Sequence, residues 1–292
     1  MSPTSATLPA TVPDTVPLPP GLYIVATPIG NLGDLSLRAA RVLAGASLIA
    51  AEDTRVTAKL LAHIGAKVPM QAYHDHNADA VRPMLLDRMR TGVVALVSDA
   101  GTPLISDPGY KLVRDARAAG INIVTVPGAC AAIAALTLAG LPTDRFLFAG
   151  FLPVKAGAKA AVIDELGAVR ATLVFYESGP RTGATLALLA ERLGPRPAAV
   201  AREITKRFEE TVDGDLVTLA ARYADTAPRG EVVIVVGAGD GPAPASADDL
   251  DAALATAMAE QPLSVAVAEV SAALDLPRKA VYARALVLKQ QG

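Results

Sequence analysis

The sequence predicts an α/β protein with two domains and a small helical segment behind them, and three observations lead to this fold class. Between residues 21 and 126, short runs of valine, isoleucine and alanine alternate with helical patterns, as in a parallel sheet covered by helices on both faces. Between residues 127 and 239, a second series of strands alternates more strongly with polar residues. Three helical patterns follow in residues 249–290. A chain of 292 residues is long enough for about two domains.

The N-terminal α/β domain is predicted over residues 21–126. Its strands are expected at residues 22–26, 47–51, 93–98 and 121–126, and its helices at 37–43, 57–64, 78–90 and 110–119. The strands are apolar along their length, which indicates burial on both faces and therefore parallel order. Residues 1–20 are rich in proline, threonine and serine, and we expect them to form a disordered tail outside the fold.

The C-terminal α/β domain is predicted over residues 127–239, and it begins with an alanine-rich helix at 129–141 that Pro142 ends. Strands are expected in the segments RFLFAGF, TLVFYES, AAVARE, EETVDGD and EVVIVVG, with helices near 158–166 and 181–193. The dipeptide Asp213-Gly214 is a hairpin signal, so we expect a turn there. The domain is therefore predicted to hold a mixed sheet with antiparallel pairs.

Residues 240–292 are predicted to form a linker and a helical appendix. Glycine, proline and alanine dominate residues 237–244, which is typical of a linker. Turns at residues 262–264 and 276–279 separate the three helical patterns, and the arrangement is similar to a helix-turn-helix.

The composition excludes several classes of protein. A net charge of −2 gives little overall attraction to nucleic acid, so any RNA contact needs a local basic patch. The single cysteine, Cys130, excludes an intramolecular disulfide and fits a reducing cytoplasm. No apolar run reaches the roughly 18 residues of a membrane span, and residues 1–20 lack the basic start of a secretory signal. We therefore expect a cytoplasmic protein.

Three predicted strands end in loops of unusual composition. Residues 27–31 read TPIGN, residues 98–109 read SDAGTPLISDPG, and residues 127–130 read PGAC. In a parallel sheet such loops leave at the same edge, where ligands bind. Gly101 and Pro103 shape the backbone of the second loop. The sequence therefore predicts a binding crevice at this edge.

Eight segments, in order along the chain, resemble the tetrapyrrole (corrin/porphyrin) methylase superfamily, and most closely its subgroup of ribosomal RNA ribose methyltransferases. They are ATPIGNLGD (26–34), AEDTR (51–55), SDAGTPLISDPG (98–109), PGACAAIAAL (127–136), GFLPVK (150–155), FYESGPR (175–181), AREITKRFEE (201–210) and RGEVVIVV (229–236). The C-terminal helical patterns also resemble a segment that this subgroup carries. The resemblance implies a tetrapyrrole-methylase-like fold, S-adenosylmethionine (AdoMet) as cofactor, no metal, and a homodimer.

The activity that the resemblance implies is methyl transfer from AdoMet to the ribose 2′-oxygen of a cytidine in the decoding region of 16S rRNA, with the small ribosomal subunit as partner. Such a transfer is an in-line displacement, so the protein must align both reactants, exclude water and take up a proton. Two alternatives stay open. One is a tetrapyrrole C-methyltransferase of the uroporphyrinogen or precorrin type, and the other is an AdoMet-sensing RNA-binding module without turnover.

Cofactor contacts are expected on both sides of a cleft between the two α/β domains. The resemblance assigns the methionine part of AdoMet to the loop that holds Asp99, although Asp99 would equally cap a turn. Cys130 lies where a helix opens after a strand, with small side chains that let backbone N–H groups approach a ligand; otherwise it is a packing residue. Tyr176 ends a strand and is as often a core residue. The expected cofactor residues are Pro28, Ile29, Asp99, Thr102, Ile105, Ser106, Ala129, Cys130, Tyr176, Arg202 and Glu231.

Charged residues near the strand ends are the candidates for catalysis. Asp53 and Arg55 follow the second strand, where Asp53 would equally cap the next helix. Glu177 and Glu203 stand near arginines in the sequence, and each is either paired with an arginine or accepts the ribose proton. These four residues form the candidate catalytic set, without a choice of base among them.

Basic residues in the same segments are the candidates for binding RNA. Lys155, Arg181, Lys206 and Arg207 are expected to hold phosphates, the alternative being solvated surface charges. The loop after residues 150–153 carries fewer basic residues than the resemblance leads us to expect, which weakens its assignment to RNA. A metal site is not expected, because two histidines two residues apart in the segment HDHN (74–77) have poor zinc spacing.

Overall fold

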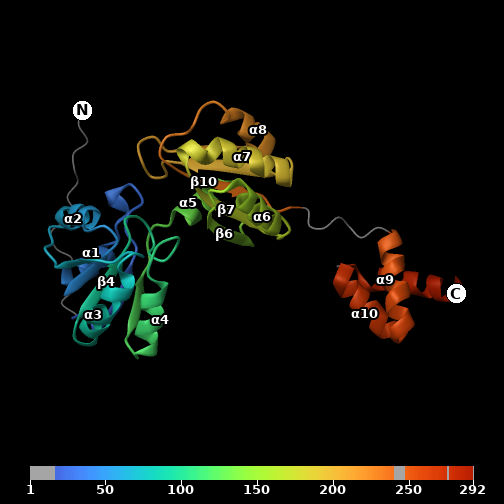
Figure 1. Cartoon of the computed structure of the whole chain (residues 1–292), viewed down its shortest axis with the longest axis horizontal. Helices are drawn as coiled ribbons and strands as arrows, with labels where there is room; N and C mark the ends of the chain where they lie inside the picture. The colour runs from blue at the N-terminus through green and yellow to red at the C-terminus, as the bar shows by residue number, and fades with distance from the viewer. Residues whose placement is uncertain (1–16, 240–246, 275, 292) are drawn as a thin grey trace. The chain divides into compact units, whose positions relative to one another are not determined.

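The computed structural model describes residues 17–239, 247–274 and 276–291. The chain divides into two compact units. The larger unit holds both sheets and extends to Ala238, apart from residues 168–170. The smaller unit consists of those three residues and the chain from Gly239 onward. Figure 1 shows the two sheets and the C-terminal helices. The tail predicted for residues 1–20 lies largely outside the described residues, as does most of the predicted linker.

The first sheet is parallel throughout, as predicted. Its strands run in the order β3-β2-β4-β1-β5. They are β1 (Gly21–Val25), β2 (Leu48–Ala51), β3 (Met70–Ala72), β4 (Val93–Val97) and β5 (Ile123–Val126). The helices between them are α1 (Leu37–Gly45), α2 (Thr54–His63), α3 (Ala78–Thr91) and α4 (Tyr110–Ala118), with a short 3-10 turn η1 (Leu32–Asp34) after β1. Strand β3 was not predicted from the sequence, because it is a three-residue edge strand that is only partly buried.

Helices cover both faces of this sheet, which explains why its strands are apolar at every position. Along β4, Ala95 and Val97 pack into one cluster with residues of α1 and α2. The intervening Leu96 packs into a second cluster with Leu85 of α3 and Leu112 of α4. Because successive strand residues point to opposite faces, a strand buried on both sides needs an apolar residue at each position.

The parallel order brings three strand exits to one edge of the sheet. Strand β1 lies between β4 and β5, with Ile24 beside both Leu96 and Thr125. Beyond the strands, the backbones of Thr27 and Gly101 exchange two hydrogen bonds of 2.9 and 3.1 Å. The loops that follow β1, β4 and β5 therefore leave side by side, as the sequence predicted.

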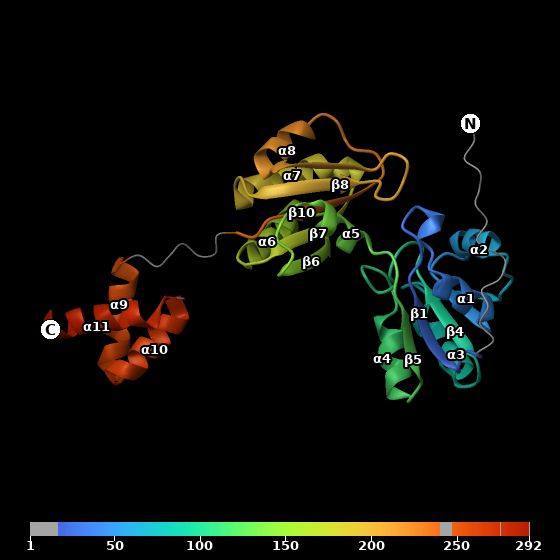
Figure 2. The same cartoon turned by 180° about the vertical axis from the view of Figure 1, so that it is seen from behind.

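The second sheet is mixed, with one parallel pair. Its strands run in the order β6-β7-β10-β8-β9, and only β6 and β7 are parallel. They are β6 (Phe146–Phe151), β7 (Thr172–Ser178), β8 (Pro197–Arg202), β9 (Glu210–Asp215) and β10 (Glu231–Val236). Helices α6 (Ala156–Gly167), α7 (Gly179–Leu193) and α8 (Leu216–Arg222) contribute to the apolar cluster on one face, and α5 (Ala131–Leu138) packs on the other. Figures 1 and 2 show α7 and α8 together on one side of β10.

The predicted turn at Asp213-Gly214 is wrong. Both residues lie inside β9, where they pair with Ala199 and Ala198 of β8. The hairpin instead runs through residues 203–209, and Asp215 ends β9 by capping α8 through the backbone N–H of Thr218 at 2.8 Å. An aspartate–glycine pair favours a tight turn only where the partner strand also stops. Here β8 continues alongside.

The smaller unit contains the three C-terminal helices that the sequence predicted: α9 (Ala247–Glu260), α10 (Leu263–Leu274) and α11 (Arg278–Gln291). Prolines precede α10 and α11, at the two turns expected from the sequence. Leu254, Val267 and Val281 are fully buried in a common core. Within the described ranges, no helix combines the length and the apolar character that crossing a bilayer requires.

Candidate active site

A cavity of about 370 Å³ lies in the larger unit, where the loops after β1, β4 and β5 meet the ends of β7, β8 and β10. Its volume is in the range typical of small-molecule sites. The lining combines residues from both sheets: Ile29, Glu52, Asp99, Thr102, Ile105, Ser106, Asp107, Cys130, Phe151, Tyr176, Glu177, Ser178, Glu203, Ile204, Lys206, Gly230, Glu231 and Val233. Eight of the eleven residues expected to contact a cofactor are among them.

The loop after β4 forms one wall of this cavity and is tied to its neighbours. The hydroxyl of Thr102 donates a 2.9 Å hydrogen bond to the carbonyl of Ala129, at the exit of β5. Gly101 has a φ of 81°, and a Cβ on it would lie 3.2 Å from Ile29, so glycine suits this turn. Leu104 and Ser106 also have positive φ values, 75° and 67°, which are unusual for residues with side chains. Such backbone strain is common at ligand-binding loops.

Three carboxylates line the same wall: Glu52, Asp99 and Asp107. The backbone N–H of Asp99 donates to Glu52 at 3.3 Å, and Asp99 in turn accepts from the backbone N–H of Asp53 at 3.0 Å. Burial raises the pKa of each carboxyl, and that of Asp107 rises to about 6 because Glu52 and Asp99 add to the effect. Glu52 and Asp107 are half-buried and Asp99 is exposed. Three carboxylates so close together attract a cationic ligand. Glu52 and Asp107 were not among the predicted site residues, although both lie in the segments AEDTR and SDAGTPLISDPG that resemble the family.

Tyr176 at the end of β7 faces the start of α5. Its hydroxyl oxygen accepts a 3.1 Å hydrogen bond from the backbone N–H of Ala132. Burial raises the pKa of the Tyr176 phenol far above its ordinary value, so the hydroxyl stays protonated at neutral pH. The rings of Phe148 and Phe151 pack edge-on against it at 4.8 and 5.6 Å. Tyr176 thus belongs both to the wall of the cavity and to an aromatic cluster.

The loop between β8 and β9 and the start of β10 form the opposite wall. Glu203 accepts a 3.0 Å ion-pair contact from the ammonium of Lys206. Gly230 has a φ of 85°, and a Cβ there would lie 2.0 Å from Oε1 of Glu203, so no larger residue fits without moving this carboxylate. The aliphatic stem of Lys206 lies against Gly30, in the loop that follows β1. This wall therefore depends on two glycines, because Lys206 packs directly on Gly30 and Glu203 packs directly on Gly230.

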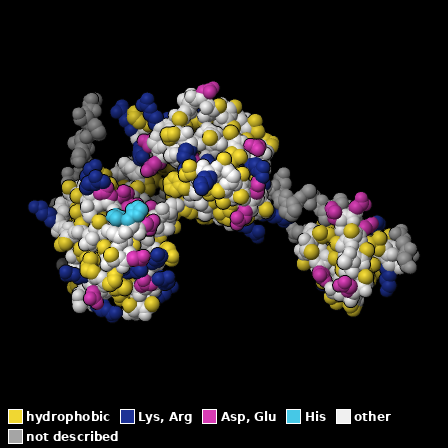
Figure 3. Space-filling model, viewed as in Figure 1, with side chains coloured by type: hydrophobic (Ala, Val, Ile, Leu, Met, Phe, Trp, Pro, Cys, Tyr) yellow, Lys and Arg dark blue, Asp and Glu magenta, His cyan; other side chains and the backbone are white. Residues whose placement is uncertain are grey.

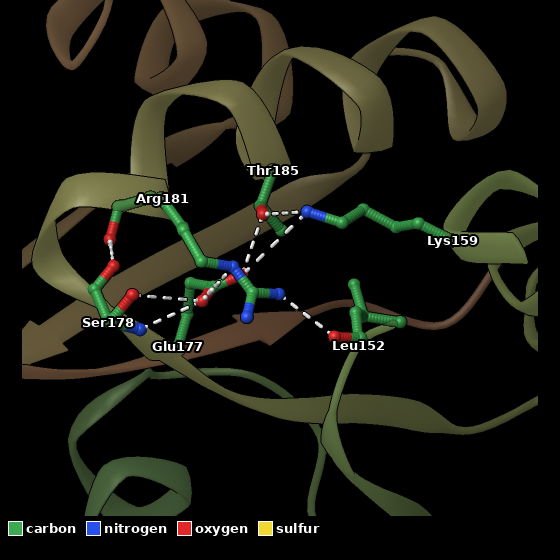
Figure 4. Close-up of polar contacts among 7 residues, drawn as sticks. Leu152, Lys159, Glu177, Ser178, Arg181 and Thr185 are labelled. Carbon is green, nitrogen blue, oxygen red and sulfur yellow. Dashed lines mark hydrogen bonds and ion pairs between the residues drawn. The ribbon is translucent and has the colours of Figure 1, made fainter. Parts of the chain in front are cut away.

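A buried polar cluster lies behind the end of β7 (Figure 4). Oε1 of Glu177 accepts from the backbone N–H of Ser178 at 2.8 Å and from Nε of Arg181 at 3.1 Å. Oε2 accepts from the hydroxyl of Thr185 at 2.7 Å and lies 4.0 Å from the ammonium of Lys159. Both oxygens of Glu177 are thus occupied, which is the paired arrangement that the sequence left open.

Lys159 is the unexpected member of this cluster, because it comes from α6 and is only 8% exposed. Its ammonium donates to the hydroxyl of Thr185 at 2.8 Å, and burial lowers its pKa. Arg181 also donates from Nη2 to the carbonyl of Leu152, at 2.9 Å. The cluster therefore joins β7, α6, α7 and the loop after β6 next to the cavity.

The remaining sequence-predicted residues lie outside the cavity lining. Asp53 caps α2 and pairs with Arg55 at 2.6 Å, and the side chain of Arg55 is 88% exposed. Ion pairing with Arg55 lowers the pKa of Asp53 to about 2. Arg202 pairs with Glu210 at 2.7 Å, and Pro28 lines a smaller neighbouring cavity.

The basic residues expected to bind RNA are spread over several elements. Lys155 and Arg207 are exposed, whereas Arg181 and Lys206 are partly buried in the contacts described above. Figure 3 shows acidic and basic side chains mixed over the visible face of the larger unit. The histidines of the segment HDHN precede α3, where Asn77 accepts a 2.9 Å hydrogen bond from the backbone N–H of His74.

Comparisons with known proteins agree with this architecture. Residues 21–220 match the family described as Tetrapyrrole (Corrin/Porphyrin) Methylases, and residues 244–289 match the family described as RsmI C-terminal HTH domain. The chain is 50% identical over 277 residues to Ribosomal RNA small subunit methyltransferase I of Mesorhizobium japonicum, covering 94% of each chain. It is 52% identical over 273 residues to the protein of the same name from Erythrobacter litoralis, covering 94% of this chain and 97% of the relative.

Solved structures show the same fold at lower identity. A crystal structure of uroporphyrin-III-C-methyltransferase from Thermus thermophilus matches with a TM-score of 0.54 and 26% identity, covering 74% of this chain and 93% of that one. Another structure of that enzyme, complexed with S-adenyl homocysteine, matches with a TM-score of 0.52 and 22% identity over 74% and 97% of the two chains. Diphthine synthase matches with a TM-score of 0.58 and 14% identity, covering 74% and 89%.

Proposed function

This chain belongs to the tetrapyrrole (corrin/porphyrin) methylase family, and within it to the ribosomal RNA small subunit methyltransferases I, and from this premise we propose a specific reaction. The enzyme transfers a methyl group from AdoMet to the ribose 2′-oxygen of a cytidine in the decoding region of 16S rRNA. The observation that carries the proposal is the cavity in which residues of both sheets meet, because its walls come from the segments on which the resemblance to the family rests.

The residues around the cavity fit AdoMet as the cofactor. Glu52, Asp99 and Asp107 give one wall a negative charge, which suits a ligand that carries a sulfonium and an ammonium group. The complex of the structural neighbour with S-adenyl homocysteine supports the same cofactor. When bound, AdoMet supplies an activated methyl group on a positively charged sulfur.

Eight side chains of the cavity lining would hold this cofactor. They are Ile29, Asp99, Thr102, Ile105, Ser106, Cys130, Tyr176 and Glu231. Ala129 contributes through its carbonyl, which fixes Thr102, whereas Pro28 and Arg202 support the strand exits on either side. Gly101, Leu104 and Ser106 have positive φ values, and Thr102 is hydrogen-bonded to Ala129. The loop would therefore bind the cofactor in a shape that it already has.

The chain's own residues have two tasks in the reaction: they align the ribose oxygen and they accept its proton. Among the carboxylates at the cavity, Glu203 is paired with Lys206 and Glu177 is occupied by four donors. Asp107 has a pKa of about 6, close to the value that suits a base at neutral pH. We assign proton uptake to Asp107 and the support of the cavity wall to Glu177 and Glu203, with Asp53 and Arg55 fixing the exit of β2.

On the substrate side, Lys155, Arg181, Lys206 and Arg207 would contact phosphates of the RNA, since phosphate contacts orient a nucleic acid without reading its sequence. The partner is the small ribosomal subunit in the cytoplasm, and the working form is a homodimer. Light scattering of the purified protein tests the last point, because a monomeric mass would contradict it.

The decisive experiment uses small subunits from a strain that lacks the gene. With AdoMet labelled in its methyl group, the enzyme should label 16S rRNA at one ribose, and mass mapping of nuclease fragments should place the methyl group on a cytidine 2′-oxygen. Subunits from the parent strain, already methylated, are the matched control and should take up no label. Label on a base, or none on either subunit, would contradict the proposal.

The competing function is methylation of a tetrapyrrole carbon, which the likeness to uroporphyrin-III-C-methyltransferase favours. Against it stand relatives of 50% and 52% identity that are named for ribosomal RNA, and the C-terminal helices, which match a domain named for that subgroup. Incubation with uroporphyrinogen III and labelled AdoMet distinguishes the two, since only the competing function predicts a methylated macrocycle.

A further inference from the structure

The tip of the loop between β8 and β9 carries an exposed aromatic ring that the fold does not use. Phe208 is 65% exposed, whereas most large apolar side chains of the two sheets are buried. The guanidinium carbon of Arg207 lies 5.5 Å from the centroid of the Phe208 ring, so a cation and a ring are presented together. A single exposed apolar side chain is ordinary in a folded protein. What distinguishes Phe208 is the guanidinium beside its ring, an arrangement that suits a planar ligand with a negative charge.

The loop that carries this ring is held in one shape. The hydroxyl of Thr205 donates a 2.6 Å hydrogen bond to Asp34 of η1, and its backbone N–H donates to Glu209. Two reverse turns close the loop, through Lys206 N–H to Glu203 O at 2.9 Å and Glu209 N–H to Lys206 O at 3.2 Å. A ring on a fixed loop loses little conformational freedom on binding, so it is already arranged for a ligand.

The charges of the loop leave one cation free at the tip. Glu203 pairs with Lys206 at 3.0 Å, and Glu210 pairs with Arg202 at 2.7 Å. Glu209 accepts from the backbone of Thr205. Arg207 is exposed and, among the residues that the structure describes, enters no ion pair. The tip therefore offers a flat apolar face and an unpaired guanidinium to the same partner.

The partner that fits this pair has a planar face and a negative charge one short step apart, as a nucleotide in single-stranded RNA has. The tip is also close to the cavity, because Ile204 and Lys206 of the same loop line it. Figures 1 and 3 show this loop at the edge of the larger unit, with basic side chains projecting around its end. An RNA strand that enters the cavity would therefore lie beside Arg207 and Phe208 at the tip of this loop.

We propose that Phe208 stacks on an unpaired base of the substrate RNA beside the nucleotide that enters the cavity, and that Arg207 contacts its phosphate. This inference rests on the proposed function and adds to it a residue that positions the RNA. Stacking on an aromatic ring tolerates any base, so Phe208 holds the strand in register, whereas selection of the cytidine belongs to the cavity.

The test compares Phe208→Ala with Phe208→Trp in the full chain, on small subunits that lack the methyl group. Phe208→Ala should raise KM for the subunits by roughly 5- to 150-fold, as expected for one lost stacking contact, while kcat at saturation and the Kd for AdoMet stay within about twofold. Phe208→Trp should restore the KM. Phe146→Ala is the matched control, because Phe146 is also exposed, at 44%, but begins β6 at the opposite end from the cavity.

A second measurement does not depend on turnover. A short single-stranded RNA that carries 2-aminopurine should lose fluorescence on binding the wild-type protein, and this quenching should disappear in Phe208→Ala and persist in Phe146→Ala. If wild-type protein quenches the probe but methylates no subunit, the proposed function fails and the stacking contact stands.

Two results would overturn the inference. One is a KM for Phe208→Ala within twofold of the wild type, together with undiminished quenching. The other is a change of molecular mass in light scattering for Phe208→Ala, which would assign the ring to a contact between two copies of the chain.

Discussion

The hydroxyl of Thr205 donates a 2.6 Å hydrogen bond to Oδ2 of Asp34, and this contact joins the loop after β8 to the turn after β1. The two residues follow strands of different sheets and are far apart in the sequence. Thr205 lies within the segment whose residues Glu203, Ile204 and Lys206 line the cavity. The hydrogen bond therefore holds the loop after β8 against η1, at the edge of the candidate active site.

Removing this hydrogen bond should loosen the cavity without unfolding the chain. Thr205→Ala is expected to weaken AdoMet binding by about 5- to 10-fold, since a hydrogen bond of this type contributes about 1 kcal/mol. Isothermal titration calorimetry measures the Kd. Thr205→Ser is the matched control, because it keeps the hydroxyl and should bind as the wild type does. Equal Kd values for the alanine and serine variants would show that the contact plays no part.

Gly230 should tolerate no side chain, because a Cβ would meet Oε1 of Glu203 at 2.0 Å. Gly230→Ala is expected to displace Glu203 and Lys206 and to weaken AdoMet binding at least 10-fold. Gly65→Ala is the control: Gly65 has a similar left-handed φ of 67°, but a Cβ there meets nothing within 4 Å. Both variants carry the backbone strain of about 1–2 kcal/mol for a left-handed residue. A loss of binding shared equally by both would contradict the steric explanation.

The carboxyl of Asp107 should make stability depend on pH. Its pKa rises from 3.8 to about 6 because of burial, so the folded chain binds this proton more tightly than the unfolded chain. The stabilising contribution is therefore complete below about pH 4 and is lost as the pH rises through about 6. Asp107→Asn, which stays neutral, should unfold a few degrees higher than the wild type at about pH 8 and at an equal temperature near pH 4.

Thermal unfolding followed by circular dichroism checks this dependence. Asp164→Asn provides a control of opposite sign, since pairing with Arg192 lowers the pKa of Asp164. Losing the Asp164 carboxylate should destabilise the protein at neutral pH, and it should have no effect well below the pKa of Asp164. Parallel curves for Asp107→Asn and the wild type across this range would rule out a buried, neutral Asp107.

The cluster around Glu177 should contribute more to stability than to chemistry. Glu177→Gln removes a negative charge that lies between Arg181 and Lys159, and it leaves Lys159 buried without a counter-ion. Breaking a buried pair on one side typically costs about 3–5 kcal/mol, so the free energy of unfolding in urea should fall by about 3 kcal/mol. If Glu177→Gln kept its stability but lost turnover, Glu177 would be the proton acceptor instead.

Local pattern was sufficient to predict where β1 and β4 of the first sheet end. The strand before Thr27 and the strand before Asp99 are buried on both faces, so their apolar runs stop abruptly where the chain leaves the sheet. That change of composition predicted a binding crevice at this edge of the sheet. The family resemblance then assigned Ile29, Asp99 and Thr102 to it, and all three line the cavity. The three C-terminal helices could also be predicted from local pattern, because prolines precede two of them.

Contacts between residues that are distant in the sequence could not be predicted. The ion pair of Glu177 with Lys159 depends on α6 packing beside α7. The spacing of these two residues in the sequence does not predict it. Asp213-Gly214 has the composition of a turn, but β8 runs on beside it and keeps it in a strand.

The parallel character of the first sheet, the exits that bear the site residues and the family resemblance follow from the sequence alone, because a strand buried on both faces of a sheet is apolar at every position. The spatial order of the strands does not follow from it. What only the tertiary structure decided is which charges are free and which are paired. Electrostatic partners are chosen by proximity in space, so the half-buried Asp107, the occupied Glu177 and the exposed Arg207 are distinguished only once the two sheets are folded.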